Sequence, residues 1–425
     1  MLSGGEGMNS GKEASVYLEE THDYIVANWA RCRVDPSTIE KEIYRLPKPF
    51  TPPAPGGLFH CLFYWDTFFT NRGLISDGHL DWAKDNVEDL IYELKEWGFV
   101  PNSNSDPGVI YISQPPYLHF MVKDIFEQTH DEAWLLGAYE ALKIEYAFWM
   151  KKRITSNGLN RHYGHETRTK EQLLSYYRYV AKDRLHLPLD IPEDEQIRKG
   201  AEYAAASEAG LDFSPRFGDF GGSINPVDLN ANLYGLECDL ASYAERFEKN
   251  RAPFYLEAAI HRKALMDQFM LGKDGLYHDF NYVKKEQSPL HFSGQFMPFI
   301  TGLLKDKEAA KALLQTLLGP GGVFSTEEDD GKILYQAAYP YSWPYDNFLA
   351  YWALKKIGLM DEADLVTECY LGAVGRSFMS TGRLWETYDG RDGSIAHKKE
   401  YATQEMMGWT AGTFETMLAD KEKAK

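Results

Sequence analysis

The stretch LDWAKDNVEDLIYELKEWG, residues 80–98, decides the fold class. Its apolar residues recur at steps of three and four from Leu80 through Leu94 to Trp97, which is the period of a helix with one buried face. Gly98 follows directly, and glycine readily adopts the left-handed conformation in which many helices end. The stretch therefore predicts an amphipathic helix that stops at Trp97.

Similar patterns run along most of the chain, whereas strand-like alternation occurs only in short pieces such as 275–282. Further helices are expected over 131–150, 229–247, 253–270, 307–318, 346–357, 361–377 and 404–419. The polar and aromatic residues gather in the loops expected between them, over 52–69, 101–116, 212–227, 319–343 and 381–401. About a dozen helices with functional loops between them predict an all-α fold, an (α/α)6 toroid built from helical hairpins.

Composition limits the partners of this chain of 425 residues. The net charge of −18 argues against nucleic acid or an anionic membrane as partner. Four scattered cysteines form no zinc-binding spacing and are expected to be free thiols. No stretch has the length and apolarity of a signal peptide or a membrane span, so a cytoplasmic location is expected.

The chain is expected to form a single catalytic domain over residues 51–420, after an N-terminal extension and first helix over 1–50. The segment 155–200 is charged and polar. It is expected to be an insertion or a lid over the site, because such a segment offers little to a buried core.

Two carboxylates carry the candidate chemistry. Asp212 lies in the stretch SEAGLDFSPR, residues 207–216, and Glu386 lies between Trp385 and Tyr388. Such distant acids meet only if the fold brings two loops to one cavity, and paired carboxyl groups across a sugar site are the machinery of glycoside hydrolysis. The alternative for Asp212 is a helix cap, and the alternative for Glu386 is a paired surface acid. Arg216, four residues after Asp212, is expected to contact substrate or another acid.

Other residues suit the walls of a sugar site. The run FYWDTFF, residues 63–69, places Tyr64, Trp65 and Asp66 together; aromatic faces stack on sugar rings, and a carboxylate binds hydroxyl groups. Asn102 and Gln114 offer amide donors and acceptors. The alternative for the aromatic run is the start of a core helix capped by Asp66. No nucleotide-binding loop, zinc-protease motif or serine-hydrolase motif is present.

The motifs together resemble the trehalase family of inverting α-glycosidases and its relatives that cleave α-glucosides and α-mannosides. The resemblance covers roughly residues 50–415 and rests on pieces in the family order: PGGLF (55–59) with YWD (64–66), GFVPN (98–102), SQPP (113–116), EAGLDFSPR (208–216), PVDLN (226–230), Gln336 with Tyr339-Pro340 and Trp343, ETYD (386–389), Glu400-Tyr401 and GWT (408–410).

The resemblance implies an (α/α)6 toroid in which Asp212 is the general acid and Glu386 the general base. It implies a set of sugar-binding residues: Phe59, Tyr64, Trp65, Asp66, Asn102, Gln114, Arg216, Trp343 and Glu400. Glu400 is also a rival for the base role. No metal and no cofactor are expected in this mechanism.

Three departures bear on the substrate. Leu58 stands where the family has arginine, Ala337-Ala338 replaces a Trp-Asp pair, and the Arg-x-Glu element before the acid loop has only a poor match at 166–168. In the family, the residues that this chain lacks largely bind the substrate, whereas both catalytic carboxylates remain here. The sequence therefore predicts an inverting, exo-acting α-glycoside hydrolase that releases a monosaccharide from a small α-glucoside or disaccharide. The alternatives are an α-glucosyl- or mannosylglycerate hydrolase, an inverting disaccharide phosphorylase and a non-catalytic sugar-binding relative.

Overall fold

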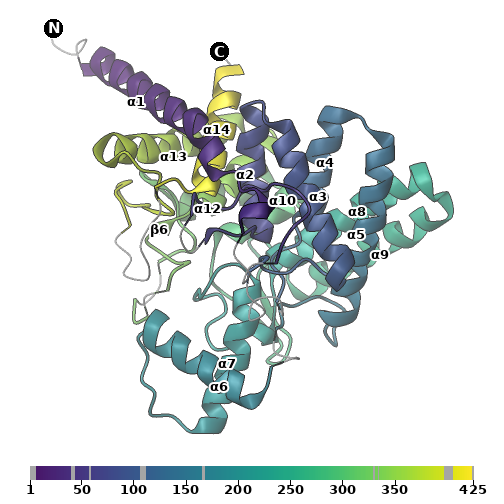
Figure 1. Cartoon of the computed structure of the whole chain (residues 1–425). Helices are drawn as coiled ribbons and strands as arrows, with labels where there is room; N and C mark the ends of the chain where they lie inside the picture. Colours follow the sequence, from purple (N-terminus) through teal and green to yellow (C-terminus); the bar gives the residue numbers. More distant parts are fainter. Residues whose placement is uncertain are drawn as a thin grey trace.

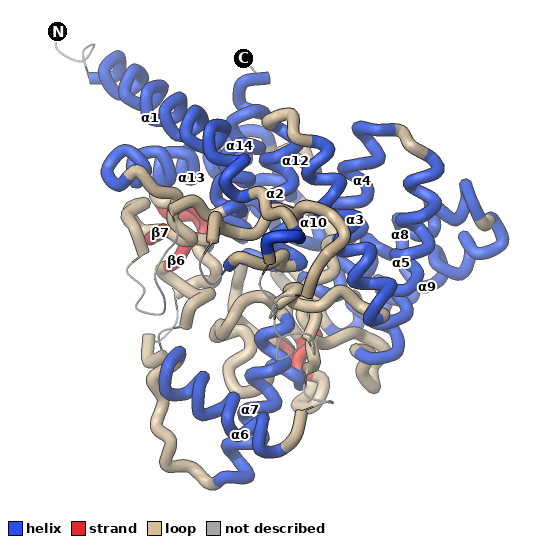
Figure 2. The backbone as a smooth tube through the Cα atoms, viewed as in Figure 1, coloured by secondary structure: helices blue, strands red, loops and turns tan. Residues whose placement is uncertain are grey.

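The computed structural model describes residues 6–39, 44–56, 59–105, 112–164, 168–328, 331–333, 335–396 and 405–423. The described chain is largely helical, and its strands are two residues long (Figures 1 and 2). The strands are β1 (Ile224–Asn225), β2 (Phe280–Asn281), β3 (Glu286–Gln287), β4 (Leu318–Gly319), β5 (Gly322–Val323), β6 (Tyr341–Ser342) and β7 (Tyr388–Asp389). The all-α prediction is confirmed.

The helices form two concentric layers. The inner layer consists of α2 (Tyr64–Ser76), α4 (Leu118–Thr129), α8 (Val227–Phe247), α10 (Met297–Thr301), α12 (Pro344–Lys356) and α14 (Gly408–Lys423). The outer layer consists of α1 (Glu6–Asn28), α3 (Leu80–Trp97), α5 (Glu132–Lys152), α9 (Ala252–Phe269), α11 (Lys307–Leu317) and α13 (Met360–Thr381). The chain passes between the layers at each step, so the structure is consistent with the predicted (α/α)6 toroid.

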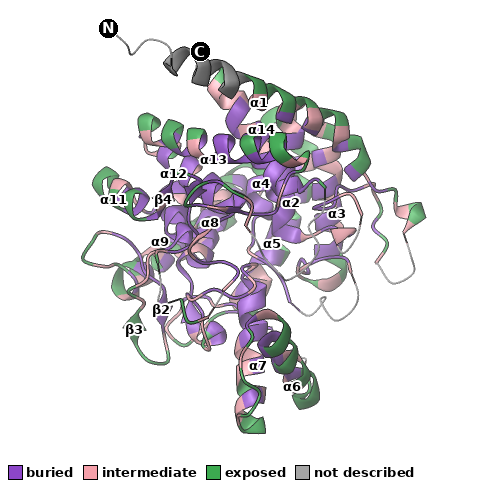
Figure 3. Cartoon of the chain, turned by 90° about the vertical axis from the view of Figure 1, so that its left-hand side faces the viewer, coloured by how far each residue is buried: buried purple, intermediate pink, exposed green. Residues whose placement is uncertain are grey.

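Contacts around the inner layer close the ring. Helix α2 packs on α4, α8 on α10, α10 on α12, and α12 on α14, which returns to α2. Helices α4 and α8 are joined by His119, whose ring nitrogens lie 2.8 Å from Asp239 and 2.7 Å from Asn232. Figure 3 shows that buried residues fill this interior and that exposed residues lie on the outer faces.

All six described inner helices direct their N-terminal ends toward one end of the ring. Residues in or just before their first turns, among them Asp66 of α2, Asp228 of α8 and Trp409 of α14, line cavities at that end. Helix N-termini carry unpaired N–H groups and partial positive charge. This end of the ring is therefore suited to polar ligands.

Local sequence explains where several helices begin and end. Asp131 caps α5 by accepting a hydrogen bond from Trp134 N at 3.0 Å, and Asp306 caps α11 by accepting one from Glu308 N at 2.9 Å. Gly98 ends α3 with a φ of 75°, as its place after the helical pattern predicts.

The expected long helices are all present within a few residues of their predicted bounds. One expected loop, 52–69, is partly wrong because α2 begins at Tyr64. The aromatic residues of this run, which suggested a site wall, belong to the helix. Phe68 and Phe69 are fully buried. Helix α1 packs on α13, so its described part joins the outer layer, and the division of the chain at residue 50 stays a proposal.

The polar segment contributes a helical hairpin that interrupts the alternation of layers. Helix α6 (Lys170–Tyr179) continues into a π-helical turn over Val180–Arg184, and α7 (Glu193–Glu208) returns beside α6. The hairpin follows α5 and precedes α8 in the chain. It projects from the ring at the lower end of the molecule as drawn in Figures 1 and 3. That it moves as a lid stays a prediction.

The ring is closed where α14 crosses α2 through two glycines. A Cβ atom on Gly412 would lie 2.0 Å from the carbonyl oxygen of Phe69, and one on Gly73 would lie 2.5 Å from the Cα of Gly412. Real Cβ atoms do not approach backbone atoms this closely. The two helices therefore need hydrogen in place of a side chain at this crossing.

We expect Gly412→Ala to lower the free energy of unfolding by about 1–3 kcal/mol or more, because α14 must move away from α2. Gly137→Ala is the matched control: Gly137 is exposed in α5 and has no atom near the position of a Cβ, so alanine should raise stability by up to about 1 kcal/mol. Thermal unfolding of both variants measures the difference. Equal melting temperatures would contradict the close crossing.

Candidate active site

A cavity of about 460 Å³ opens at the end of the ring where the inner helices begin. Both predicted catalytic acids line it, together with most of the predicted sugar-binding residues: Phe59, Trp65, Asp66, Asn102, Gln114, Asp212, Trp343 and Glu386. Residues from widely separated loops thus share one hollow. Its volume suits a small ligand such as a sugar or disaccharide.

Asp212 reaches the cavity through a strained turn after α7. Asp212 and Phe213 have φ angles of 30° and 81°, and Gly210 has a φ of 72°. Non-glycine residues rarely adopt positive φ, and such strain gathers at functional sites. A Cβ on Gly210 would also lie 2.7 Å from the indole of Trp65, so glycine lets the loop rest on that ring.

A buried carboxylate anchors this turn. Glu208 is fully buried at the end of α7, and its oxygens lie 2.7 Å from Arg153 Nη2 and 2.8 Å from Arg153 Nε. It also accepts hydrogen bonds from Ser113 N at 3.0 Å and Tyr163 N at 2.8 Å. Burial alone would raise the pKa of Glu208, but Arg153 and then His162 outweigh it and bring the pKa to about 2. Glu208 is therefore ionised and ties three segments of chain together.

Glu386 reaches the cavity from the loop between α13 and α14. Its side chain is largely buried. The next residues form β7, which pairs with β6 in the register Ser342↔Tyr388, and Thr387 Oγ1 donates to Ser342 O at 3.0 Å. This pairing sets Glu386 beside the loop that carries Gln336 and Trp343.

Asp66 lies at the first turn of α2, near both of these acids. Burial raises the pKa of Asp66 to about 7, and the charges of Glu386 and, to a smaller extent, Asp212 add to the rise. Two carboxyl groups of the cavity thus act on the pKa of Asp66. The raised pKa favours the protonated form of Asp66, in which the carboxyl group can both donate and accept hydrogen bonds.

Aromatic rings form the walls. Trp65 packs on Tyr345 with ring centroids 4.9 Å apart and on Trp409 at 6.2 Å, and Trp343 packs on Trp409 at 5.4 Å. Gln114 caps α2, because its Oε1 accepts a hydrogen bond from Trp65 N at 3.0 Å. These contacts fix the rings, so they present rigid faces to a ligand.

Two predicted residues, Tyr64 and Arg216, lie elsewhere, and one falls outside the described residues. Tyr64 is fully buried away from the cavity, and its hydroxyl donates to Glu145 at 2.5 Å. The sugar contact predicted for Tyr64 is therefore corrected to a contact within the core, because alternate residues of a helix start face different sides. Glu400 falls outside the described residues, as do Leu58 and Glu166.

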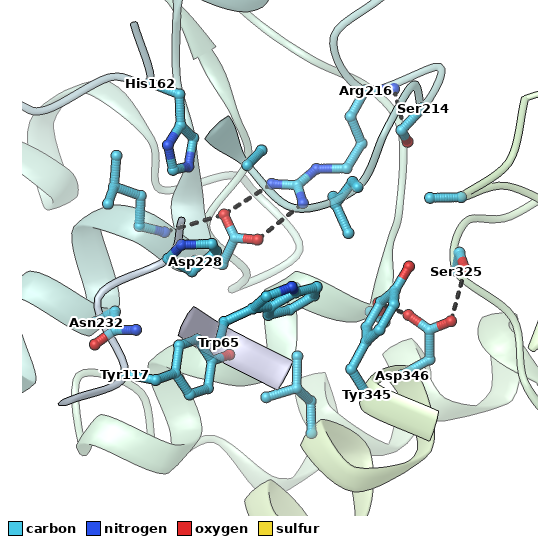
Figure 4. Close-up of a pocket in the computed structure, with 18 residues that line it drawn as sticks. Trp65, Tyr117, His162, Ser214, Arg216, Asp228, Asn232, Ser325, Tyr345 and Asp346 are labelled. Atoms are coloured by element: carbon cyan, nitrogen blue, oxygen red, sulfur yellow. Dashed lines mark hydrogen bonds and ion pairs between the residues drawn. The ribbon is translucent and has the colours of Figure 1, made fainter. Parts of the chain in front are cut away.

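Arg216 also lies outside the cavity and contacts acids. Its guanidinium forms ion pairs with Asp228 at 2.9 Å and Asp279 at 3.0 Å and lies 3.7 Å from the ring centre of Phe292. It lines a smaller neighbouring cavity that shares Trp65 and Tyr345 with the larger one (Figure 4). Of the two expectations for Arg216, contact with another acid is the one that the structure has.

Sequence reasoning missed the cavity residues that the helical hairpin supplies. They are Arg168, Tyr176, Tyr179 and Arg184. Arg184 ends the π-helical turn, lies 3.5 Å from Asp212 Oδ2 and donates to Gln336 Oε1. The basic character of the segment was a signal, but nothing in the sequence indicated which of its side chains face the acid loop.

The ring of helices and the cavity that Asp212 and Glu386 both line are those of a glycoside hydrolase of the helical-toroid class. The sequence profile of the trehalase family matches residues 10–421. The chain belongs to this family and is a glycoside hydrolase of the kind that acts on α-glucosides such as trehalose.

Relatives in sequence support the family, and relatives in structure support the fold. The periplasmic trehalases of Salmonella paratyphi B and Salmonella agona are each 30% identical over 431 residues, which cover 94% of this chain and 73% of theirs. Neutral trehalase Nth1 from Saccharomyces cerevisiae matches the structure with a TM-score of 0.73 at 23% identity, covering 87% of this chain and 73% of that one. The GH63 mannosylglycerate hydrolase from Thermus thermophilus matches with a TM-score of 0.60 at 16% identity, covering 93% of this chain and 99% of that one. The two structural likenesses bear on the fold.

The expected cytoplasmic location is contradicted. The curated relatives are periplasmic trehalases, which points away from the cytoplasm. The expectation rested on the absence of a signal-like stretch, and that absence does not decide where the protein is located. Within the described residues, no helix combines the length and apolarity needed to cross a bilayer.

The pKa of Asp66 predicts a pH dependence of stability. Its folded pKa of about 7 exceeds the unfolded value of 3.8, so between those values the native state keeps a proton that the unfolded chain has lost. Stability then falls as pH rises through this window, by at most about 1.4 kcal/mol per pH unit from this group. Asp66→Asn, which mimics the protonated form, should exceed the melting temperature of the wild type by a wider margin at pH 7.5 than at pH 5, because pH 5 lies near the start of this window.

The control for this prediction is Asp190→Asn, because Asp190 is exposed in the hairpin loop. Its melting temperature should differ from that of the wild type by the same small amount at both pH values. A constant difference between Asp66→Asn and the wild type across the window would contradict the raised pKa.

Proposed function

We propose that this protein hydrolyses a small α-glucoside from its non-reducing end with inversion, using Asp212 as general acid and Glu386 as general base. The observation that carries the proposal is the meeting of these two acids in one cavity of about 460 Å³, although 174 positions separate them in the chain. Trehalose is the substrate that the family membership favours.

Hydrolysis proceeds in one displacement in this proposal. Asp212 donates its proton to the glycosidic oxygen as the bond to the anomeric carbon breaks. Glu386 takes a proton from a water molecule whose oxygen attacks that carbon from the opposite face. Inversion needs roughly 6.5–9.5 Å between the carboxyl groups so that this water fits between them. The aromatic walls exclude bulk water and hold the sugar ring while charge develops.

Asp66 is proposed to bind hydroxyl groups of the sugar. Its pKa of about 7, which results from burial and from Glu386, lets one carboxyl group act as donor to one hydroxyl and acceptor from another. Asn102 and Gln114 line the same cavity and supply further polar contacts. Such contacts improve turnover only where they strengthen in the transition state.

We expect Asp212→Asn and Glu386→Gln each to lower kcat for trehalose by at least about 10²–10⁴-fold, because each removes one proton transfer. Asp190→Asn and Glu368→Gln are exposed controls that keep full activity. Proton NMR of the first product should show β-glucose from the hydrolysed half of trehalose, the anomer that an inverting attack creates. The leaving half keeps its α configuration, so α-glucose alone, with no initial β anomer, would overturn the proposal, as would wild-type turnover in either acid variant.

A second candidate is an α-glycosidase whose aglycone carries a carboxylate, such as a glycosylglycerate. The observation that favours it is Arg168, which lines the cavity and whose buried Nε has no hydrogen-bond partner among the described residues. The structural neighbour from Thermus thermophilus is a mannosylglycerate hydrolase. A guanidinium at the wall of a sugar site suits a carboxylate ligand.

Arg168→Met separates the two substrates. If the substrate is a glycosyl acid, we expect KM for glucosylglycerate to rise about 10–150-fold, since a charge-assisted hydrogen bond contributes about 1.5–3 kcal/mol. KM for trehalose should change less than about 10-fold. Arg178→Met, an exposed substitution on the same helical hairpin, is the matched control. Equal effects on both substrates would rule out a dedicated carboxylate contact.

Two further readings have distinct outcomes in the same assays. A phosphorylase would turn over only with inorganic phosphate and release a sugar phosphate. A non-catalytic relative would bind sugar without product. The presence of both acids in the cavity favours hydrolysis over either.

A further inference from the structure

Two histidines and an aspartate converge outside the catalytic cavity. Asp274 lies in the turn after α9, His278 follows it, and His291 comes from the loop after β3. Asp274 Oδ2 lies 2.9 Å from His278 Nε2 and 3.2 Å from His291 Nε2. The three ligand atoms all lie within 4.8 Å of one another. The proposed catalytic mechanism uses none of the three.

The spacing fits the coordination shell of a small divalent cation. Nitrogen and carboxylate ligands lie about 2.0–2.2 Å from zinc, which sets neighbouring ligand atoms about 3 Å apart around the ion. The two distances from Asp274 Oδ2 match that edge. The rings of His278 and His291 meet at 70° with centroids 5.4 Å apart, and the Nε2 atoms of both lie near the same oxygen of Asp274.

The surroundings of His291 give an independent reason to place a cation here. Its Nδ1 lies 3.3 Å from Glu327 Oε2, while its Nε2 lies 3.2 Å from Asp274. Both neighbours are carboxylates, and their negative charge favours a cation at this place. A metal ion at Nε2 leaves the Nδ1 hydrogen of His291 to point to Glu327. A carboxylate behind a ligating histidine is the common arrangement at zinc sites.

The backbone holds these side chains in place. Leu276 N donates to Asp274 Oδ1 at 3.1 Å, and His291 N donates to Glu327 Oε1 at 2.9 Å. A Cβ on Gly272 would lie 2.7 Å from the ring of His278, so the turn is packed directly against that imidazole. Asp274 and His291 remain partly exposed, with side-chain exposures of 38% and 27%. The cluster is thus preformed and open to ions from solvent.

We propose that Asp274, His278 and His291 bind a structural divalent cation of the zinc type, with water completing a four-coordinate shell. The ion would join the turn after α9 to the loop before α10, and Glu327 would join both to the loop after β5. These segments lie next to the acid loop: Asp279, next to His278, binds Arg216. The metal stabilises these loops and takes no part in bond cleavage.

A second cluster of similar composition, His22, Asp77 and Glu415, is less suited to a metal. Burial raises the pKa of Glu415 to about 10, and Asp77 adds to the rise. Glu415 is therefore protonated at neutral pH, and a protonated carboxyl group is a poor ligand.

The test uses the whole protein after treatment with EDTA and gel filtration. Titration with Co²⁺ should give saturable visible absorption bands of four-coordinate cobalt at one ion per chain, and added Zn²⁺ should abolish them. Zn²⁺ should also raise the melting temperature of the wild type, since it binds the folded state.

Asp274→Asn and His291→Gln should each weaken binding at least about 10-fold, and both residues are exposed enough for the fold to persist. Glu327→Gln leaves all three ligands and should weaken binding about 10–100-fold. His261→Gln, on an exposed histidine of α9, is the control and should bind as the wild type does. Absence of saturable binding to the wild type, or unchanged affinity in Asp274→Asn and His291→Gln, would overturn the proposal.

Discussion

The ion pair between Glu208 and Arg153 is the constraint on which the site depends. A buried pair of this kind repays the cost of desolvation only when further hydrogen bonds satisfy its atoms, and here Ser113 N and Tyr163 N supply them. The carboxylate thereby fixes the end of α7, the end of α5 and the loop before α4 at one point. Asp212 lies four residues further on, so its strained turn starts from a rigid base.

A second charged group supports the other side of the acid loop. Arg216 lies between Asp228 and Asp279, which joins the acid loop to the start of α8 and to the segment that leads into β2. Both anchors use arginine, whose planar guanidinium binds two carboxylates or both oxygens of one. The long loops of this enzyme are therefore rigid where they bear the chemistry, although little regular secondary structure holds them.

Much of the fold followed from local pattern. Helices such as 80–97 and 307–317 could be predicted because one face of each is apolar at a helical period, and the long loops between helices were recognisable by their polar and aromatic residues. The start of α2 was only an alternative interpretation of the aromatic run, because aromatic residues lie on both sides of Asp66 in the sequence, which removes the periodic contrast. The partners of Tyr64 and Arg216 could not be predicted for a different reason. Glu145 and the two acids that bind Arg216 come from other segments of the chain.

The sequence by itself determined the helical class and the order of the motifs in the family pattern, and it predicted the two acids, since residue types and spacing carry that information. Only the tertiary structure decided which residues face the cavity, because a helix start exposes adjacent residues to different sides. It also brought Arg168 and Arg184 to the cavity and His291 to Asp274. These contacts form between segments that are far apart in the chain. The order of residues in a sequence does not show which distant segments lie close together in the fold.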